Sequence, residues 1–249
     1  MNPFFAIVRV TLRQLTDRKR VLGFTLLSLA PAGIFYLAAR TGGLSTFEQG
    51  FAAILVAPFF SIVLPIVTLV LAASALGDER KDKTLSFLVL RPVRRFDIAA
   101  AKTIAAALVA SAFATVGAAG IAIAYGSVGG EASVLGASVA GAVIAAFMYS
   151  GLFVLLGYAV ARPTLVGLLY VLLVDNTLIA LLPRLSSFSG WRIGFAATAD
   201  LIPDTLGDIG SGAIGSIDPS VSGSLLQALV TVAVTVTVCA VILRRSDNV

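Results

Sequence analysis

Six long apolar runs alternate with shorter polar stretches along the chain. Each run approaches or exceeds the roughly 20 residues that an α-helix needs to cross the hydrocarbon core of a membrane. The pattern therefore predicts an all-α integral membrane protein with six transmembrane helices in a single transmembrane domain, residues 1–249. The six runs are residues 21–39, 51–76, 98–124, 134–160, 164–182 and 225–243.

Two of these runs carry features that predict more than a plain helix. Pro58 and Pro65 lie in the second run and are expected to kink it, which membrane helices tolerate when neighbouring groups satisfy the freed carbonyls. Ala137 and Gly141 in the fourth run form a pair of small residues four apart, a spacing that favours close helix approach.

The first 20 residues have an amphipathic helical pattern. Such a basic helix, placed directly before a membrane span, is typical of the cytoplasmic headgroup layer, and Arg9, Leu12 and Arg13 are its candidate interfacial residues. The alternative is a charged anchor that only sets the topology. The apolar face comprises Phe4, Phe5, Val8, Leu12 and Leu15, and the polar face comprises Arg9, Arg13, Thr16 and Arg20.

Composition supports the membrane class and excludes several others. Of the 249 residues, 58% are hydrophobic, and the mean hydropathy is +1.00, more apolar surface than a soluble domain could cover. The chain has no histidine and one cysteine, Cys239, which removes disulfide frameworks and the usual zinc and haem ligand sets. We expect no metal site and no catalytic residues.

The basic residues predict the orientation. With the N-terminus in the cytoplasm, fifteen of the eighteen lysines and arginines lie inside, and only Arg40, Arg184 and Arg192 lie outside. Both termini and the connection 77–97 are then cytoplasmic, and the 42 residues 183–224 form an extracellular loop. We expect that loop to be flexible, with short helices near Trp191 and residues 200–206. Because the positive charge follows the membrane, the net charge of +5 does not indicate a nucleic-acid partner.

Asp175, followed by Asn176, lies inside the fifth run. An ionisable side chain at this depth is a candidate functional group, which would line a substrate pathway or carry protons. The alternative is a structural role near the outer interface, paired or hydrogen-bonded at a helix break. No basic partner within the membrane is evident from the sequence.

The connection 77–97 is strongly charged, yet it contains a small apolar patch. Leu85, Leu88 and Val89 have the spacing of one helical face, and Pro92 should end that helix. Charges of both signs surround the patch, as in a helix that docks into a groove of a soluble partner. The alternative, a basic anchor lying on the bilayer, fits less well because the interspersed carboxylates would be repelled by anionic lipid.

At these residues the chain resembles the ABC-2-type ABC transporter permeases. The motif residues are Glu79, Arg80, Thr84, Leu85, Leu88, Arg91, Pro92, Val93, Arg95 and Lys102. The run from Gly167 to Tyr170, followed by Asp175 and by Leu181 to Pro183, is similar to the fifth span of the nitrous-oxide-reductase-maturation-like branch. Three positions depart from the pattern: Lys83 replaces a glycine, Asp175 a glutamate, and Thr11 an acidic residue.

The resemblance implies the ABC-2, or type V exporter-like, fold and a half-transporter. Two permease subunits, as a homodimer or a related heterodimer, would bind two cytosolic ABC ATPase subunits. Those subunits would hold ATP and Mg, because this chain has no phosphate-loop motif and needs no cofactor of its own. Residues 84–90 would form the coupling helix. The full ATPase-coupling interface would be Glu79, Arg80, Thr84, Leu85, Leu88, Val89, Arg91, Pro92, Val93 and Arg95.

The leading hypothesis is therefore a non-catalytic permease subunit in the plasma membrane of a prokaryote, exporting an amphipathic or hydrophobic substrate. One alternative is a membrane anchor that transmits the ATPase cycle without transport. A second alternative is an ion-coupled carrier that uses Asp175, although the sequence lacks the paired broken spans of inverted repeats.

Overall fold

The computed structural model describes residues 3–44, 46–81, 94–178, 181–202, 217–218 and 220–245. Within these ranges the regular structure is entirely helical. In chain order the helices are α1 (Pro3–Leu15), α2 (Arg18–Arg40), α3 (Phe47–Ile54), the π-helix η1 (Leu55–Val63), α4 (Leu64–Lys81), α6 (Arg95–Gly126), α7 (Val134–Ala159), α8 (Pro163–Leu169), the π-helix η2 (Tyr170–Leu178), the 3₁₀-helix η3 (Pro183–Phe188), α10 (Gly190–Leu201) and α12 (Val221–Arg245).

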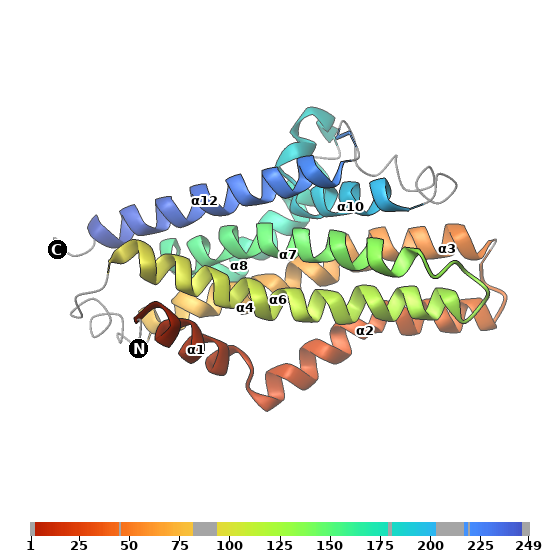
Figure 1. Ribbon diagram of the computed structural model, residues 1–249, viewed down its shortest axis with the longest axis horizontal. Helices are drawn as coiled ribbons and strands as arrows, with labels where there is room; N and C mark the ends of the chain where they lie inside the picture. The colour runs from red at the N-terminus through yellow and green to blue at the C-terminus, as the bar shows by residue number, and fades with distance from the viewer. Residues whose placement is uncertain are drawn as a thin grey trace.

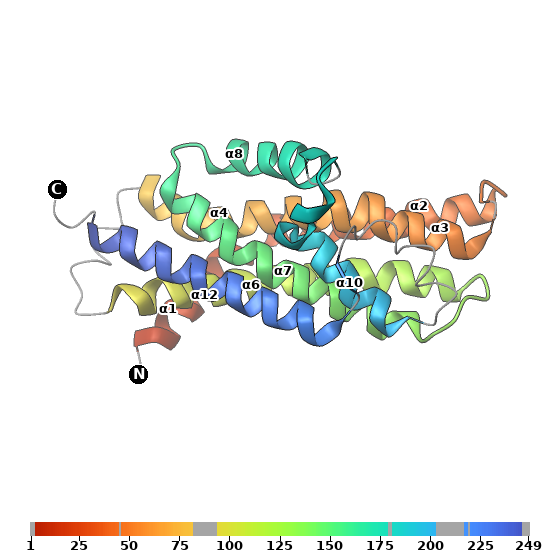
Figure 2. The same ribbon diagram turned by 90° about the horizontal axis from the view of Figure 1, so that it is seen from above.

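Helix α7 is the centre of an elongated bundle. It packs against α4, α6, α10 and α12, while α2 packs mainly on α6 (Figures 1 and 2). The start of α1, the end of α4, the start of α6 and the end of α12 all lie at the same end of the bundle (Figure 1). The chain thus brings its two terminal helices and both ends of the connection 82–93 to one end of the molecule.

Five of the six predicted spans are confirmed as helices long and apolar enough to cross a membrane. The predicted span 164–182 differs, because its apolar helix is shorter, Pro163–Thr177, and passes from α8 into the π-helical turns of η2 before η3 begins. The five long helices are Arg18–Arg40, Phe47–Glu79, Arg95–Gly126, Val134–Ala159 and Val221–Arg244.

These helices differ in how much of their surface the bundle covers. In its most apolar stretch α2 has 17% of its residues buried, whereas α6 and α7 each have 61%. An apolar helix that the protein leaves uncovered is suited to contact with lipid or with another membrane subunit. Helix α2 is therefore at the periphery of the bundle, and α6 and α7 form its core.

The second span is not a uniform α-helix. Pro58 lies in the π-helix η1, which separates α3 from α4, and Pro65 is the second residue of α4. Proline removes a backbone donor and crowds the preceding turn, so a break in the regular hydrogen bonding is expected near it. The kink predicted for this span takes the form of a π-helical segment.

The short helix expected near Trp191 is present as α10, Gly190–Leu201. Its first nine residues are buried, which corrects the expectation that this part of the loop 183–224 is hydrophilic and flexible. Ser189 caps its N-terminus by accepting a hydrogen bond from the Arg192 amide at 3.4 Å. The helix packs between α7 and α12, where its many small and apolar residues are covered.

Candidate functional site

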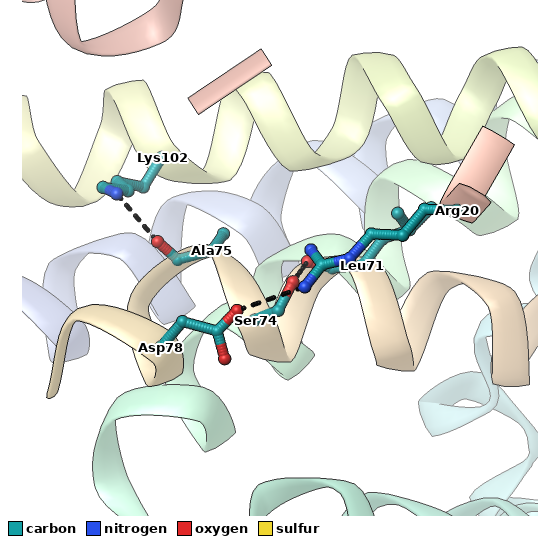
Figure 3. Close-up of polar contacts among 6 residues, drawn as sticks. All are labelled: Arg20, Leu71, Ser74, Ala75, Asp78 and Lys102. Atoms are coloured by element: carbon teal, nitrogen blue, oxygen red, sulfur yellow. Dashed lines mark hydrogen bonds and ion pairs between the residues drawn. The ribbon is translucent and has the colours of Figure 1, made fainter. Parts of the chain in front are cut away.

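The connection that carries the predicted coupling helix is bordered by a buried lysine. Lys102, two turns into α6, is 1% exposed, and its ammonium donates to the Ala75 carbonyl of α4 at 2.8 Å (Figure 3). The same ammonium forms an ion pair with Glu79, whose side chain is largely buried. Because Glu79 precedes the connection and Lys102 follows it, one charged contact ties the two ends of that connection together.

A second ion pair joins the start of α2 to the same turns of α4. The Arg20 guanidinium lies 3.6 Å from the Asp78 carboxylate, and both side chains are substantially exposed (Figure 3). One turn earlier, the Ser74 hydroxyl donates to the Leu71 carbonyl at 2.9 Å. Since exposed pairs contribute about 0–1 kcal/mol, the buried Lys102–Glu79 contact dominates this cluster.

The predicted ATPase-coupling residues are only partly described. Glu79 lies at the end of α4 and forms an ion pair with Lys102, and Arg95 is the first residue of α6. Arg80 lies on the last turn of α4. The coupling helix itself stays a prediction, because Thr84, Leu85, Leu88, Val89, Arg91, Pro92 and Val93 lie outside the described residues.

The predicted N-terminal amphipathic helix is confirmed as α1, which ends at Leu15 rather than extending to residue 20. Leu15 is buried and Leu12 packs against the core, while Arg9 and Arg13 are exposed. Thr11 is fully buried, so an acidic residue at this position would face the bundle and not the solvent. The helix thus leans on α6 and α4 through one face and keeps its arginines free of the core.

A second polar cluster lies deep in the bundle around Asp175. This residue of η2 is 0% exposed, and its carboxylate accepts a hydrogen bond from the Tyr149 hydroxyl of α7. The same hydroxyl accepts from the Trp191 amide of α10 at 3.1 Å. Tyr149 therefore joins η2 to α10 through a single oxygen, and a buried hydroxyl that both donates and accepts is well satisfied.

Arg192 corrects one expectation from the sequence. It was expected in an external loop that is largely flexible, but it lies in α10, is 7% exposed and is close enough to Asp175 to affect that carboxylate electrostatically. Ser189 also lies beside this carboxylate. The side of the membrane on which Arg192 lies stays a prediction. A buried carboxylate next to an arginine and two hydroxyls has the surroundings of a structural charge pair.

Asn176 connects the two π-helical segments. Its amide donates to the Ser61 carbonyl of η1 at 3.0 Å and to the Val171 carbonyl of η2 at 2.8 Å. A π-helix pairs residues i and i+5 in place of the α-helical i and i+4, and the Asn176 amide adds a side-chain donor to one carbonyl in each of the two segments. Asp175 and Asn176 are therefore adjacent in sequence but fasten η2 to different elements.

A groove of about 690 Å³ lies beside the Asp175 cluster, between α7, α12 and the η3–α10 junction. Its walls are mostly apolar, with Met148 and Leu152 on one side and Leu226 and Val230 on the other. Tyr149 separates the groove from Asp175, since it lines the groove and donates to that carboxylate. The arrangement accommodates apolar groups and offers no set of reactive side chains.

Comparison with known families decides the class of this protein. The family described as ABC-2 family transporter protein matches residues 17–183 of the 249. The chain belongs to this family. It is a multi-pass membrane protein and a permease subunit of the ABC-2 class of ABC transporters, which associate with an ABC ATPase. No curated protein matches the chain.

The ABC-2 match spans both polar clusters, apart from α10. It begins before Arg20 and includes Glu79, Lys102, Tyr149 and Asp175. It ends before Arg192, whose burial beside Asp175 was not predicted from the sequence. Nothing in the local pattern around Arg192 distinguishes a buried arginine from a surface one, so the contact with Asp175 required the fold.

The described part of this ABC-2 subunit also bears on metal binding. Within the described ranges, no three His, Cys, Asp or Glu side chains are grouped as a metal site would require.

The contact between Lys102 and Glu79 was not predicted from the sequence. Lys102 was noted only as one of the family's motif residues, and its partner Glu79 is 23 residues away in sequence. The charge on both sides of the connection 82–93 was the available signal, but it does not specify which residues pair.

Proposed function

We propose that this chain is the permease subunit of an ABC exporter for an amphipathic or hydrophobic substrate, driven by a separate cytosolic ATPase pair that binds ATP and Mg. The observation that carries the proposal is the contact between Glu79, just before the connection 82–93, and Lys102, after it. An ATPase acting on that connection would pull on α4 and α6 together. Both helices pack on α7, so such a movement would reach the centre of the bundle.

The proposed orientation places both termini and the connection 82–93 in the cytoplasm of a prokaryotic cell. It is supported by the gathering of α1, the end of α4, the start of α6 and the end of α12 at one end of the bundle (Figure 1). Together with residues 82–94 between α4 and α6, these segments carry 11 of the 18 lysines and arginines of the chain.

A second permease subunit, identical or related, is part of the proposal. Its support is the uncovered apolar surface of α2 and of the α8–η2 segment. Leu26 and Leu37 of α2 are 71% and 65% exposed, and Leu165 and Leu173 are 52% and 56% exposed. Surfaces of this kind suit contact with a membrane partner. The nitrous-oxide-reductase-maturation-like branch stays part of this proposal, supported by the sequence around Asp175.

The coupling role is tested with a double substitution in the proposed docking helix. Leu85→Asp with Leu88→Asp places two charges on its apolar face and is expected to abolish binding of the ATPase and stimulation of its ATP hydrolysis. The measurement is co-purification with the partner ABC ATPase subunit, followed by an assay of its ATP hydrolysis. Ser127→Asp with Ala132→Asp, two exposed residues of the connection between α6 and α7 at the opposite end of the bundle (Figure 1), is the control for added charge.

Transport itself is tested by reconstitution with the ATPase in proteoliposomes and a panel of amphipathic and hydrophobic cargoes. ATP-dependent movement of one of them, absent from the Leu85/Leu88 double variant, supports an exporter. ATPase stimulation without movement of any cargo supports the alternative of a transmitting anchor. Normal binding and stimulation by the double variant would show that the docking assignment is wrong.

A further inference from the structure

An apolar groove of about 380 Å³ lies in the angle between α1 and α2, against the middle of α6. Leu12 of α1 and Thr16, just after that helix, form one wall, and Val21 and Thr25 of α2 form the second. Residues 108 to 116 of α6 form the floor. The groove therefore begins more than three turns after the start of α6, where α2 enters the bundle (Figure 1).

The surface around this groove is also apolar. Leu22 and Leu26 on α2 are 58% and 71% exposed, and Leu108 and Val116 on α6 are 47% and 38% exposed. In a membrane protein these side chains face acyl chains, so the groove is open to lipid from the side of α2. The protein covers it with no segment of its own in the described part of the chain.

The apolar walls continue into positive charge on both helices. Arg9 lies three and seven residues before the groove residues Leu12 and Thr16, a spacing that puts it on the same helical face. Arg18 has the same spacing to Val21 and Thr25 of α2. Arg13 and Lys19 are also exposed near the junction. Asp17 is the one carboxylate between residues 3 and 20, and Arg20 is occupied by Asp78.

We propose that this groove binds an anionic phospholipid, with one acyl chain along α6 and the phosphate against the basic residues of the α1–α2 junction. Charge complementarity selects the occupant, because a zwitterionic headgroup has no net attraction to a cluster of arginine and lysine. An acyl chain in the groove packs against the exposed apolar side chains of α2 and α6. The lipid would thereby hold α1 at its angle to α2. The site is separate from the proposed cargo and ATPase contacts.

The test uses the full-length chain in phosphatidylcholine nanodiscs that contain a trace of photoactivatable lipid. The probe is phosphatidylglycerol with a diazirine in its acyl chain, compared with the matching phosphatidylcholine probe. We expect the phosphatidylglycerol probe to label peptides covering residues 12–25 and 108–116, as read by mass spectrometry. The triple substitution Arg13→Gln, Arg18→Gln and Lys19→Gln should lower that labelling by about fivefold for each charge removed.

Two matched controls separate the groove from general effects of charge and size. The triple substitution Arg40→Gln, Arg162→Gln and Arg184→Gln removes three exposed charges elsewhere and should leave the labelling unchanged. Ala112→Leu fills the groove and should lower labelling of residues 108–116, whereas Ala30→Leu on the outer face of α2 should not. Because Ala112 is exposed, the leucine variant is expected to fold, and a monodisperse elution profile verifies this.

Equal labelling by the two probes would overturn the proposal, as would unchanged labelling in both the charge and the Ala112 variants. If the Arg13/Arg18/Lys19 variant lost binding of the ATPase subunit while phosphatidylglycerol labelling stayed the same, the basic residues would serve the protein partner instead. That outcome would also refute the lipid site. None of these readouts depends on transport, so the lipid site and the exporter function are tested independently.

Discussion

Lys102 is a lysine in the buried interior of the helix bundle, where lysine side chains are rare. Almost all of its side chain is buried, and its ammonium has both a carbonyl and a carboxylate partner. A buried charge is tolerated only when such partners offset its loss of hydration. Lys102 therefore joins α4 and α6 more than two turns beyond the connection 82–93.

Lys102→Met is the first prediction at this scale. It leaves the Glu79 carboxylate partly buried without its cation, so the free energy of unfolding should fall by about 3–5 kcal/mol. Thermal unfolding of the detergent-solubilised protein measures the change. Arg20→Met, which breaks the exposed pair with Asp78, should cost no more than about 1 kcal/mol.

The double variant Lys102→Met with Glu79→Leu separates stability from coupling. Replacing both charges with apolar groups should restore most of the lost stability, because no unpaired charge remains. Stimulation of the partner ATPase should nevertheless stay low if this pair transmits movement. Full recovery of stimulation would show that the pair is only structural.

Asp175 illustrates a different use of a buried charge. Its hydroxyl partner Tyr149 also accepts from the backbone of α10, and Arg192 of that helix lies nearby. Three elements distant in sequence therefore meet at one carboxylate. The cluster fixes η2 against α7 and α10, which favours a structural role for Asp175 over a proton relay.

At the scale of helices, close approach depends on glycine. A Cβ atom added at Gly141 of α7 would fall far inside contact distance of Thr198 and of the Gly194 carbonyl on α10. Gly194 is restricted in the same way by Gly141. The two glycines thus let α7 and α10 touch through their backbones, as the spacing of Ala137 and Gly141 predicted.

Gly141→Ala should therefore destabilise the protein. The added methyl group forces α10 away from α7, and overpacking of this kind costs about 1–3 kcal/mol, or more where backbone atoms are in the way. Gly136→Ala on the same helix meets nothing within 4 Å and should be neutral or stabilising by about 0.5–1 kcal/mol. Thermal unfolding of the two variants side by side checks both signs. Equal effects would refute the close contact.

Apolar length and periodicity were sufficient to predict α1 and five of the spans from the sequence. The bounds of α7 differ from the predicted run by one residue, because a long run of lipid-compatible side chains has clear polar ends. The same reasoning predicted a short helix near Trp191 but not its burial, since the 12 residues of α10 are too few for a span and mixed in polarity. The contacts of Lys102 with Glu79 and of Asp175 with Tyr149 depend on helix packing, which no local pattern specifies.

The molecule as a whole is longer than a membrane is thick. At 1.5 Å per residue, the 32 residues of α6 extend about 48 Å, compared with a hydrocarbon core of about 30 Å. The segment Phe47–Glu79 is of similar length, 33 residues. Because the α1–α2 groove meets α6 more than three turns after its start, the excess length lies at the end that carries Glu79 and Lys102.

Thiol labelling tests the proposed orientation of the whole molecule. Arg162→Cys and Glu131→Cys place single reactive cysteines in exposed connections at opposite ends of the bundle. A membrane-impermeant maleimide added to intact spheroplasts should label Glu131→Cys at once and Arg162→Cys only after lysis. Cys239 is 1% exposed and should not react with the maleimide before or after lysis. The unsubstituted protein is therefore the control. The reverse pattern would invert the topology.

The π-helical segment Leu55–Val63 has a consequence for how the length of this chain can vary. A π-helical turn contains more residues than an α-helical turn. The segment is therefore equivalent to an α-helix that contains an inserted residue. Deleting one residue there would let the segment return to α-helical winding and keep α4 in register. The same deletion within α6 would rotate every later residue by about 100° and expose its buried face to lipid. Related sequences should therefore differ in length by single residues at 55–63 and not within α6.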